Sequence, residues 1–120
     1  MRKETANILA MLDSFVMNND DDVAMTIAND FRKRRIEKNH TREMMAQKAG
    51  VPLGNVQRFE QRGLISLKNL ISLAHALGYT AELKDIFANP KYSTMKELTE
   101  IRKNAGRKTA RQKRTNDEED

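Results

Sequence analysis

Side chains that can hydrogen-bond to nucleic-acid bases are grouped in the segment 53–62. Asn55, Gln57 and Arg58 occupy the outward positions of a short helix there. The planar guanidinium of arginine matches the O6 and N7 acceptors of guanine, and the amide of asparagine or glutamine can pair with adenine. The spacing therefore predicts a helix whose outward face carries side chains able to hydrogen-bond to base edges.

Another helix must hold this one in place, and the residues before it supply the joint. Thr41 can cap a first helix, and Gly50 stands where the chain reverses, a position that commonly needs a positive φ. Val51 fills the joint, and Pro52 suits the start of the following helix. The inward faces of both helices are small or apolar: Met45, Ala46, Ala49, Val56 and Phe59. This is the pattern of two short helices joined by a tight glycine turn, a helix-turn-helix.

Two motifs in this region are typical of a known family. The first starts at Thr41 and is Thr-x-x-x-Met-Ala-x-x-Ala-Gly-Val, and the second starts at Val56 and is Val-x-Arg-Phe-Glu. Through these motifs the segment 27–77 resembles the XRE-type, Cro and phage-repressor family of helix-turn-helix domains. The resemblance implies an all-α fold, a compact bundle of about five helices, that binds operator DNA as a dimer.

The same resemblance implies roles for individual residues. Base contacts are expected from Leu53, Gly54, Asn55, Gln57 and Arg58. Phosphate contacts are expected from Arg42, Lys48, Gln61 and Arg62. Gly54 replaces the polar residue usual in the family, which favours a close backbone approach, and Arg42 replaces the customary glutamine. Glu60 is expected to organise the loop that follows or to pair with a neighbouring arginine rather than to meet DNA.

The composition limits the class of protein. A length of 120 residues, with 38% hydrophobic and 32% charged residues, predicts one small domain with tails and a very polar surface. No cysteine is present, so neither a disulfide nor a zinc-thiolate site can form, and with only two histidines, His40 and His75, no metal site is expected. No phosphate-binding glycine loop, nucleophile elbow or metal-ligand spacing occurs. We therefore expect no cofactor, no metal and no enzymatic activity.

The sequence shows neither a membrane-spanning segment nor a signal-peptide pattern. No apolar run approaches the roughly 18 to 20 residues of a membrane span, and the start of the chain lacks a signal-peptide pattern. We expect a soluble, cytoplasmic protein that does not contact membranes.

The net charge of +5 is unevenly distributed. The run 32–48 holds seven basic residues against two acidic ones, which predicts a patch for phosphate contact. Near the C-terminus, residues 102–114 are basic and polar, and the chain ends with acidic residues at 117–120. A segment without apolar residues cannot offset its ordering entropy, so this tail is expected to be disordered. It can add nonspecific phosphate contacts, and the acidic end can shield it when DNA is absent.

The flanking segments divide the chain into three predicted parts. Residues 1–22 hold an amphipathic helix and an acidic linker, 23–88 form the DNA-binding domain, and 89–120 contain a short helix over 93–101 and the charged tail. The first helix carries an apolar stripe of Ile8, Leu9, Leu12, Phe15 and Val16. Two interpretations of this stripe are open: it packs on the domain's own core, or it forms a dimerisation or docking helix.

Inside the predicted domain, the first helix starts at Val23 after an aspartate cap. Its expected inward residues are Val23, Ile27 and Phe31. Arg34 stands where the family usually has an apolar residue, for which Ile36 is the expected substitute. A helix from Ser66 to Gly78 is expected to bury Leu67, Leu70, Ile71, Leu73, Ala74 and Leu77. A short element over 80–87, with Leu83, Ile86 and Phe87, is expected to complete the bundle.

Two functional hypotheses follow. The first is a transcriptional repressor that binds a palindromic operator as a homodimer, with half-sites about one helical turn apart. The second is a protein-interaction module. The pattern Leu53-Gly54-x-x-x-Arg58-Phe59-Glu60-Gln61-x-Gly63-x-Ile65-Ser66-Leu67, followed by Asn89-Pro90-Lys91-Tyr92, resembles regulators paired with HipA-like toxin kinases. That resemblance implies an antitoxin that neutralises the kinase and represses its own operon.

Overall fold

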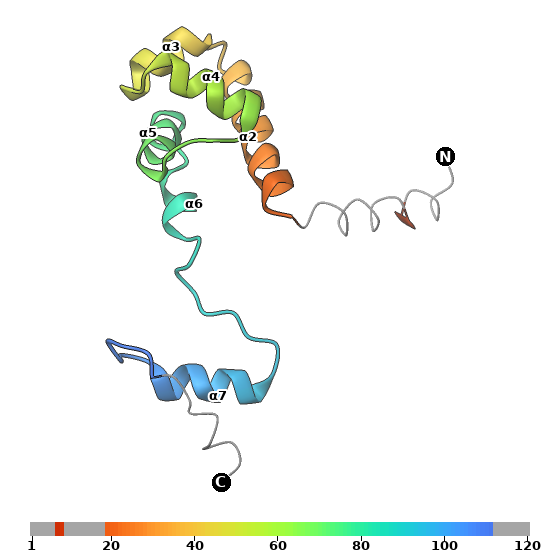
Figure 1. The fold of residues 1–120 in the computed structure, drawn as a ribbon, viewed down its shortest axis with the longest axis vertical. Helices are drawn as coiled ribbons and strands as arrows, with labels where there is room; N and C mark the ends of the chain where they lie inside the picture. Colours follow the sequence, from red (N-terminus) through yellow and green to blue (C-terminus); the bar gives the residue numbers. More distant parts are fainter. Residues whose placement is uncertain (1–6, 9–18, 112–120) are drawn as a thin grey trace. The chain divides into compact units, whose positions relative to one another are not determined.

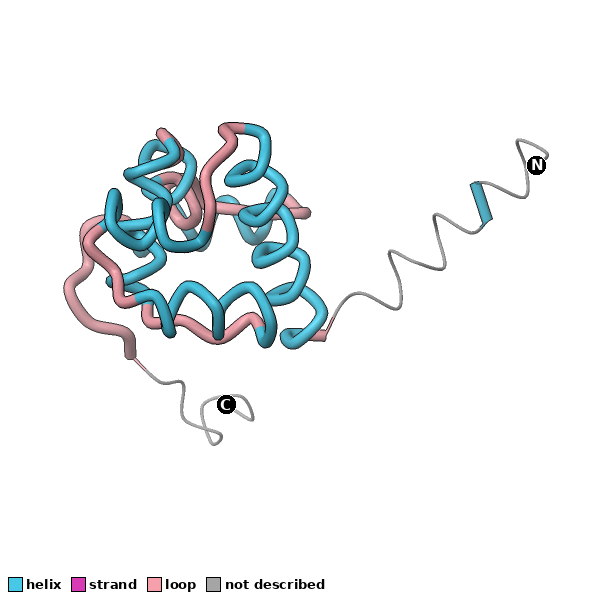
Figure 2. The backbone as a smooth tube through the Cα atoms, turned by 90° about the horizontal axis from the view of Figure 1, so that it is seen from above, coloured by secondary structure: helices cyan, strands magenta, loops and turns pink. Residues whose placement is uncertain are grey.

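The regular structure of the chain is helical in a computed structural model, which describes residues 7–8 and 19–111 (Figure 1). Two compact units are present, Met1–Lys84 and Asp85–Asp120. The first contains α2 (Asp20–Glu37), α3 (Arg42–Ala49), α4 (Leu53–Arg62), α5 (Leu67–Leu77) and α6 (Thr80–Lys84). The second contains α7 (Met95–Asn104). Within the described ranges the chain consists of helices and loops without strands (Figure 2), which confirms the predicted all-α class and the bundle of five helices.

Side-chain caps and glycines set the ends of the helices. Asn19, Thr41 and Ser66 each accept a backbone N–H in the first turn of α2, α3 and α5, at 2.8, 3.1 and 3.1 Å. Gly50 ends α3 with φ 69°, as predicted, and Gly63 ends α4 with φ 69°. These signals involve only residues that are close in sequence, so the helix ends can be predicted without knowledge of the tertiary packing.

The core of the first unit lies between α2, α3, α4 and α5. In Figure 1, α4 packs against both α2 and α3, and α5 packs against α3. The rings of Phe31 and Phe59 lie 5.3 Å apart at 51°, a tilted arrangement that aromatic pairs favour. The buried cluster consists of Ala28, Phe31, Met45, Ala46, Val51, Val56, Phe59, Leu73 and Leu77. The inward residues predicted for the turn and for α4 are thus confirmed.

The predicted start of α2 is wrong, and of its predicted inward residues only Phe31 is buried. The helix begins at Asp20, so the aspartates expected to form a linker make up its first turn, and the cap is Asn19. The buried positions are Ala28, Phe31 and Arg35, which are spaced i, i+3, i+7. The helix is rotated so that its alanines, rather than its larger aliphatic residues, face α4, since a small side chain allows a close approach there.

This rotation exposes residues that were expected inside. Val23 and Ile27 are each 46% exposed, and Ile36, the expected substitute for an apolar residue at position 34, is 50% exposed. Arg34 itself is partly exposed and lies 3.1 Å from Glu37. In this turn of α2, the side chain that is buried against the core is therefore that of Arg35.

The expected inner faces of α5 and α6 are also partly wrong. Leu67 and Ile71 are 67% and 44% exposed, because Leu73, Ala74 and Leu77 occupy the buried side of α5. Helix α6 ends at Lys84, before Ile86 and Phe87, which are 59% and 95% exposed.

The second unit is organised around α7. Thr94 accepts the N–H of Glu97 at 3.1 Å, and the Glu97 carboxylate in turn accepts from the Ser93 hydroxyl at 3.0 Å. The predicted short helix is confirmed, but it continues to Asn104. Arg102 and Lys103, expected in a disordered tail, are therefore helical.

The predicted N-terminal helix lies mostly outside the described residues. Residues 7 and 8 are helical, and Ile8 is 57% exposed. Both interpretations of its apolar stripe stay predictions.

Candidate nucleic-acid interface

The joint between α3 and α4 places the start of α4 at the surface. Val51 is 4% exposed and its N–H donates to the Ala46 carbonyl at 3.0 Å, which ties the joint to α3. Pro52 then precedes α4 as its cap without a side-chain hydrogen bond to the first turn. The amide groups at this end carry the positive end of the helix dipole, and they are free of a side-chain cap. An anion such as a DNA phosphate can take that place.

The predicted base-contacting residues form the outward side of α4. Gly54 and Arg58 are exposed, Asn55 and Gln57 are half-buried, and Leu53 packs partly against the core. A Cβ built on Gly54 would meet nothing within 4 Å, so the backbone there faces open space. The geometry is compatible with the predicted contacts, which themselves stay predictions.

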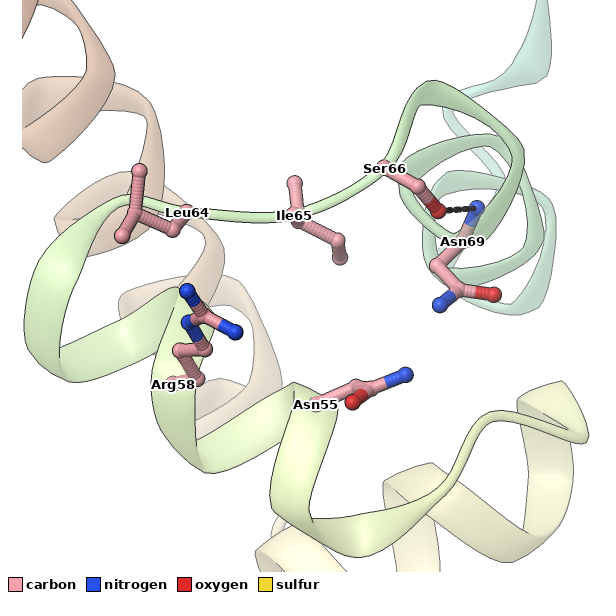
Figure 3. Close-up of a pocket in the computed structure, with 6 residues that line it drawn as sticks. All are labelled: Asn55, Arg58, Leu64, Ile65, Ser66 and Asn69. Carbon is pink, nitrogen blue, oxygen red and sulfur yellow. Dashed lines mark hydrogen bonds between the residues drawn. The ribbon is translucent and has the colours of Figure 1, made fainter.

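A hollow of about 390 Å³ adjoins this side of α4 (Figure 3). Asn55 and Arg58 reach it from α4, and Asn69 reaches it from the first turn of α5. The remaining lining residues come from the connecting loop: Leu64, Ile65 and Ser66. Sequence reasoning identified Ser66 only as a helix cap and did not identify Asn69 as a site residue. One signal in the sequence could have indicated Asn69: it is a polar residue in the first turn of the helix that follows α4, three positions after the cap Ser66.

Glu60 is completely enclosed and holds two arginines. Its Oε2 accepts from Nε of Arg35 at 2.7 Å, and its Oε1 accepts from Nη2 of Arg35 at 2.9 Å. The same Oε1 accepts from Nε of Arg42 at 3.1 Å. The Glu60 side chain is 0% exposed, and those of Arg35 and Arg42 are 9% and 32% exposed. The prediction that Glu60 pairs with a neighbouring arginine is confirmed.

Five of the seven cations in the predicted basic patch have a partner within the domain, but only Arg35 and Arg42 pair with a buried carboxylate. Four of its cations, Lys33, Arg34, Arg35 and Arg42, lie within 4.0 Å of a carboxylate. Lys38 donates to the Leu77 carbonyl at 3.3 Å. A count of charges within the run missed Glu60, the partner of Arg35 and Arg42, because Glu60 is distant in the chain, whereas Asp30 and Glu37 lie three residues from Lys33 and Arg34.

The other predicted phosphate contacts, which include Lys48 at the end of the same run, have no partner in the domain's described residues. Lys48, Gln61 and Arg62 are exposed. Within residues 19–111, none of their side chains has a hydrogen bond or an ion pair, and the same holds for Asn55 and Arg58. The polar groups on and beside α4 are thus available to an external ligand, whereas Arg42 is shared with Glu60.

Two further features are absent from the described residues, a cluster of metal ligands and a membrane-spanning helix. No group of three or more histidine, cysteine, aspartate or glutamate side chains there could hold a metal ion. None of the helices described is both long and apolar enough to span a bilayer.

Comparison with known proteins identifies the domain that carries this surface. The family model described as Helix-turn-helix matches residues 31–84, which run from the middle of α2 to the end of α6. No curated protein and no solved structure matches the chain. Residues 31–84 thus match the helix-turn-helix family over slightly less than half of the chain, and this match supports a DNA-binding regulator of the XRE type.

Proposed function

We propose that this protein is a sequence-specific transcriptional repressor that binds a palindromic operator as a homodimer, with α4 in the major groove. One observation carries the proposal. Asn55 and Arg58 line a surface hollow and have no partner among the described residues, although most arginines nearby are paired. Side chains that neither stabilise the fold nor pair with each other are available for base edges.

Each side chain on α4 has a role that fits its chemistry. Arg58 forms the bidentate contact to guanine, and Asn55 or Gln57 pairs with adenine. Leu53 contacts a thymine methyl group with the part of its side chain that the core leaves free. Gly54 allows the backbone to come close to the duplex, since nothing lies within 4 Å of the position of its missing Cβ.

The residues proposed to contact phosphates lie around the base-contacting residues of α4. Arg42 keeps its Nη groups for a phosphate while Nε remains on Glu60. Lys48, Gln61 and Arg62 add contacts from exposed positions. These groups hold the domain on the duplex without reading its sequence.

Selection of bound duplexes from a random library at near-physiological salt tests the proposal. The expected result is an enriched inverted repeat whose half-sites lie about one helical turn apart, roughly 10 base pairs. An enriched single site would contradict the dimer, and no enrichment would contradict sequence-specific binding.

Removal of residues 1–18 tests whether the N-terminal apolar stripe forms the dimer. The truncation keeps Asn19, because this residue caps α2. Light scattering is expected to show that the truncated chain is a monomer, whereas the full-length chain is a dimer. The truncated chain is also expected to bind the inverted repeat more weakly. A truncated chain that is still a dimer and binds DNA with unchanged affinity would exclude the stripe as the dimer contact.

A second candidate function is the antitoxin role. The observation that favours it is the exposure of apolar side chains at the end of the domain, with Ile86, Phe87 and Tyr92 at 59%, 95% and 52%. Such side chains are available to a protein partner. Copurification of a HipA-like kinase encoded by a neighbouring gene, lost in Phe87→Ser, would support this candidate. A kinase that copurifies equally well with Phe87→Ser would count against these residues as the contact.

A further inference from the structure

The chain folds back on itself directly after α7 and gathers cations there. Gly106 has φ 82°, a left-handed conformation, and the N–H of Arg107 donates to the Asn104 carbonyl at 3.2 Å. Arg107 Nη1 also donates to Asn104 Oδ1 at 2.9 Å, which holds the guanidinium beside the end of the helix. We call residues 104–111 the C-terminal basic turn.

This turn encloses a hollow of about 340 Å³. Its lining combines three cations with small or polar neighbours: Asn104, Arg107, Lys108, Thr109, Ala110 and Arg111. Arginine and lysine donors around a single hollow are the chemistry that binds a phosphate group.

Among residues 85–111, the described part of this unit, the cations form no ion pairs. The described residues 85–111 hold seven basic residues: Lys91, Lys96, Arg102, Lys103, Arg107, Lys108 and Arg111. Their three acidic residues are Asp85, Glu97 and Glu100, and Glu97 is engaged with Ser93 in the cap of α7. In this range no carboxylate lies within 4.0 Å of a lysine or arginine, in contrast to the run 32–48.

We propose that the C-terminal basic turn binds the phosphate backbone of duplex DNA, and that it supplies much of the sequence-independent affinity that the run 32–48 was expected to supply. The inference rests on the proposed function in so far as DNA is the ligand. The partner is committed to DNA because the helix-turn-helix domain of the same chain brings a phosphate backbone within reach. The connecting segment 85–94 spans at most about 35 Å when extended, which is about one turn of the duplex.

The salt dependence of DNA binding tests this proposal. Affinity is measured by fluorescence anisotropy over a series of salt concentrations, on the selected operator and on an unrelated duplex of equal length. The test variant is Arg107→Gln/Lys108→Gln/Arg111→Gln. The control variant, Lys84→Gln/Lys91→Gln/Lys96→Gln, removes the same charge from exposed positions outside the hollow.

The test variant is expected to lose about two to three units of the slope of log K against log salt, since each phosphate contact contributes roughly 0.9. Its affinity is expected to fall at least about tenfold and by the same factor on both duplexes, while the control loses less than one unit. All substituted side chains are exposed, and circular dichroism checks that the helix content is unchanged.

The possible results separate this inference from the proposed function. An unchanged slope in the test variant, or an equal loss in the control, overturns the inference even if the operator is still preferred. A reduced slope in a chain that shows no preference for any site upholds the inference and counts against the sequence-reading repressor.

Discussion

Arg35 and Glu60 lie 25 positions apart in the chain and form a bidentate ion pair, with Nε and Nη2 donating at 2.7 and 2.9 Å. Arg35 Nη1 also donates to the His40 carbonyl at 2.7 Å. Because Arg42 shares the same carboxylate, one buried group joins α2, the start of α3 and the end of α4. The helix that is proposed to read DNA is thus held by charge pairs as well as by apolar packing.

Breaking this pair from one side is expected to destabilise the domain. Glu60→Leu leaves the buried Arg35 without its carboxylate and is expected to lower the free energy of unfolding by about 3 to 5 kcal/mol. Arg35→Met leaves the Glu60 carboxylate with Arg42 alone and is expected to cost somewhat less. The double variant is expected to cost less than the sum, since it removes both buried charges of the pair, and Arg42, which loses its carboxylate, is 32% exposed and reaches solvent. Urea unfolding of the four proteins measures the cycle. Additive single effects would show that the two side chains are not coupled.

Gly63 is predicted to tolerate a side chain less well than Gly78. Both have positive φ, 69° and 85°, but a Cβ on Gly63 would lie 3.1 Å from the Ala24 backbone, whereas one on Gly78 would meet nothing within 4 Å. Gly78→Ala is expected to cost about 1 kcal/mol through backbone strain, and Gly63→Ala clearly more. Thermal unfolding compares the two variants. Equal losses would mean that α2 moves away from α4 at little cost.

Gly54→Ala is expected to change stability and DNA binding in opposite directions. Replacement of a helical glycine raises the free energy of unfolding by up to about 1 kcal/mol, and the open space around this position leaves nothing to clash with in the free protein. On DNA, the added methyl group is expected to weaken binding by blocking a close backbone approach. Denaturation and anisotropy measure the two effects. Unchanged DNA affinity would contradict the assigned role of Gly54.

Arg42→Ala is expected to weaken binding to all duplexes by about the same factor and to reduce the salt slope by about 1, as loss of one phosphate contact does. Arg42→Lys serves as the control, because it keeps the charge but loses the Nε donor to Glu60. Anisotropy on operator and nonoperator duplexes checks this. If Arg42→Ala altered the preference among bases, the residue would have a different role.

Signals confined to neighbouring residues predicted the helix-turn-helix correctly. The caps at Thr41 and Ser66, the turn at Gly50 and the buried Val51 each depend on a few residues in sequence. The register of α2 was not predictable in this way. Arg35 is buried because it pairs with Glu60, which is distant in sequence. A pattern of apolar residues cannot predict the burial of a charged residue whose partner lies elsewhere in the chain.

The candidate site shows the same limit. The outward residues of α4 follow from helical spacing and were predicted, although contacts with DNA are untested. The hollow beside Asn55 and Arg58 also needs Asn69, which α5 brings to the same surface from a different helix. Local patterns could not show that juxtaposition, because it depends on how α5 packs against the rest of the bundle.

Affinity of the wild-type chain and of Arg58→Ala for the selected operator, and for all its single-base-pair variants, tests the central claim most directly. The account predicts that Arg58→Ala loses about 1 to 3 kcal/mol of binding and stops discriminating at one guanine position in each half-site, with the other preferences retained. A uniform loss of affinity at every position would contradict direct base reading by Arg58.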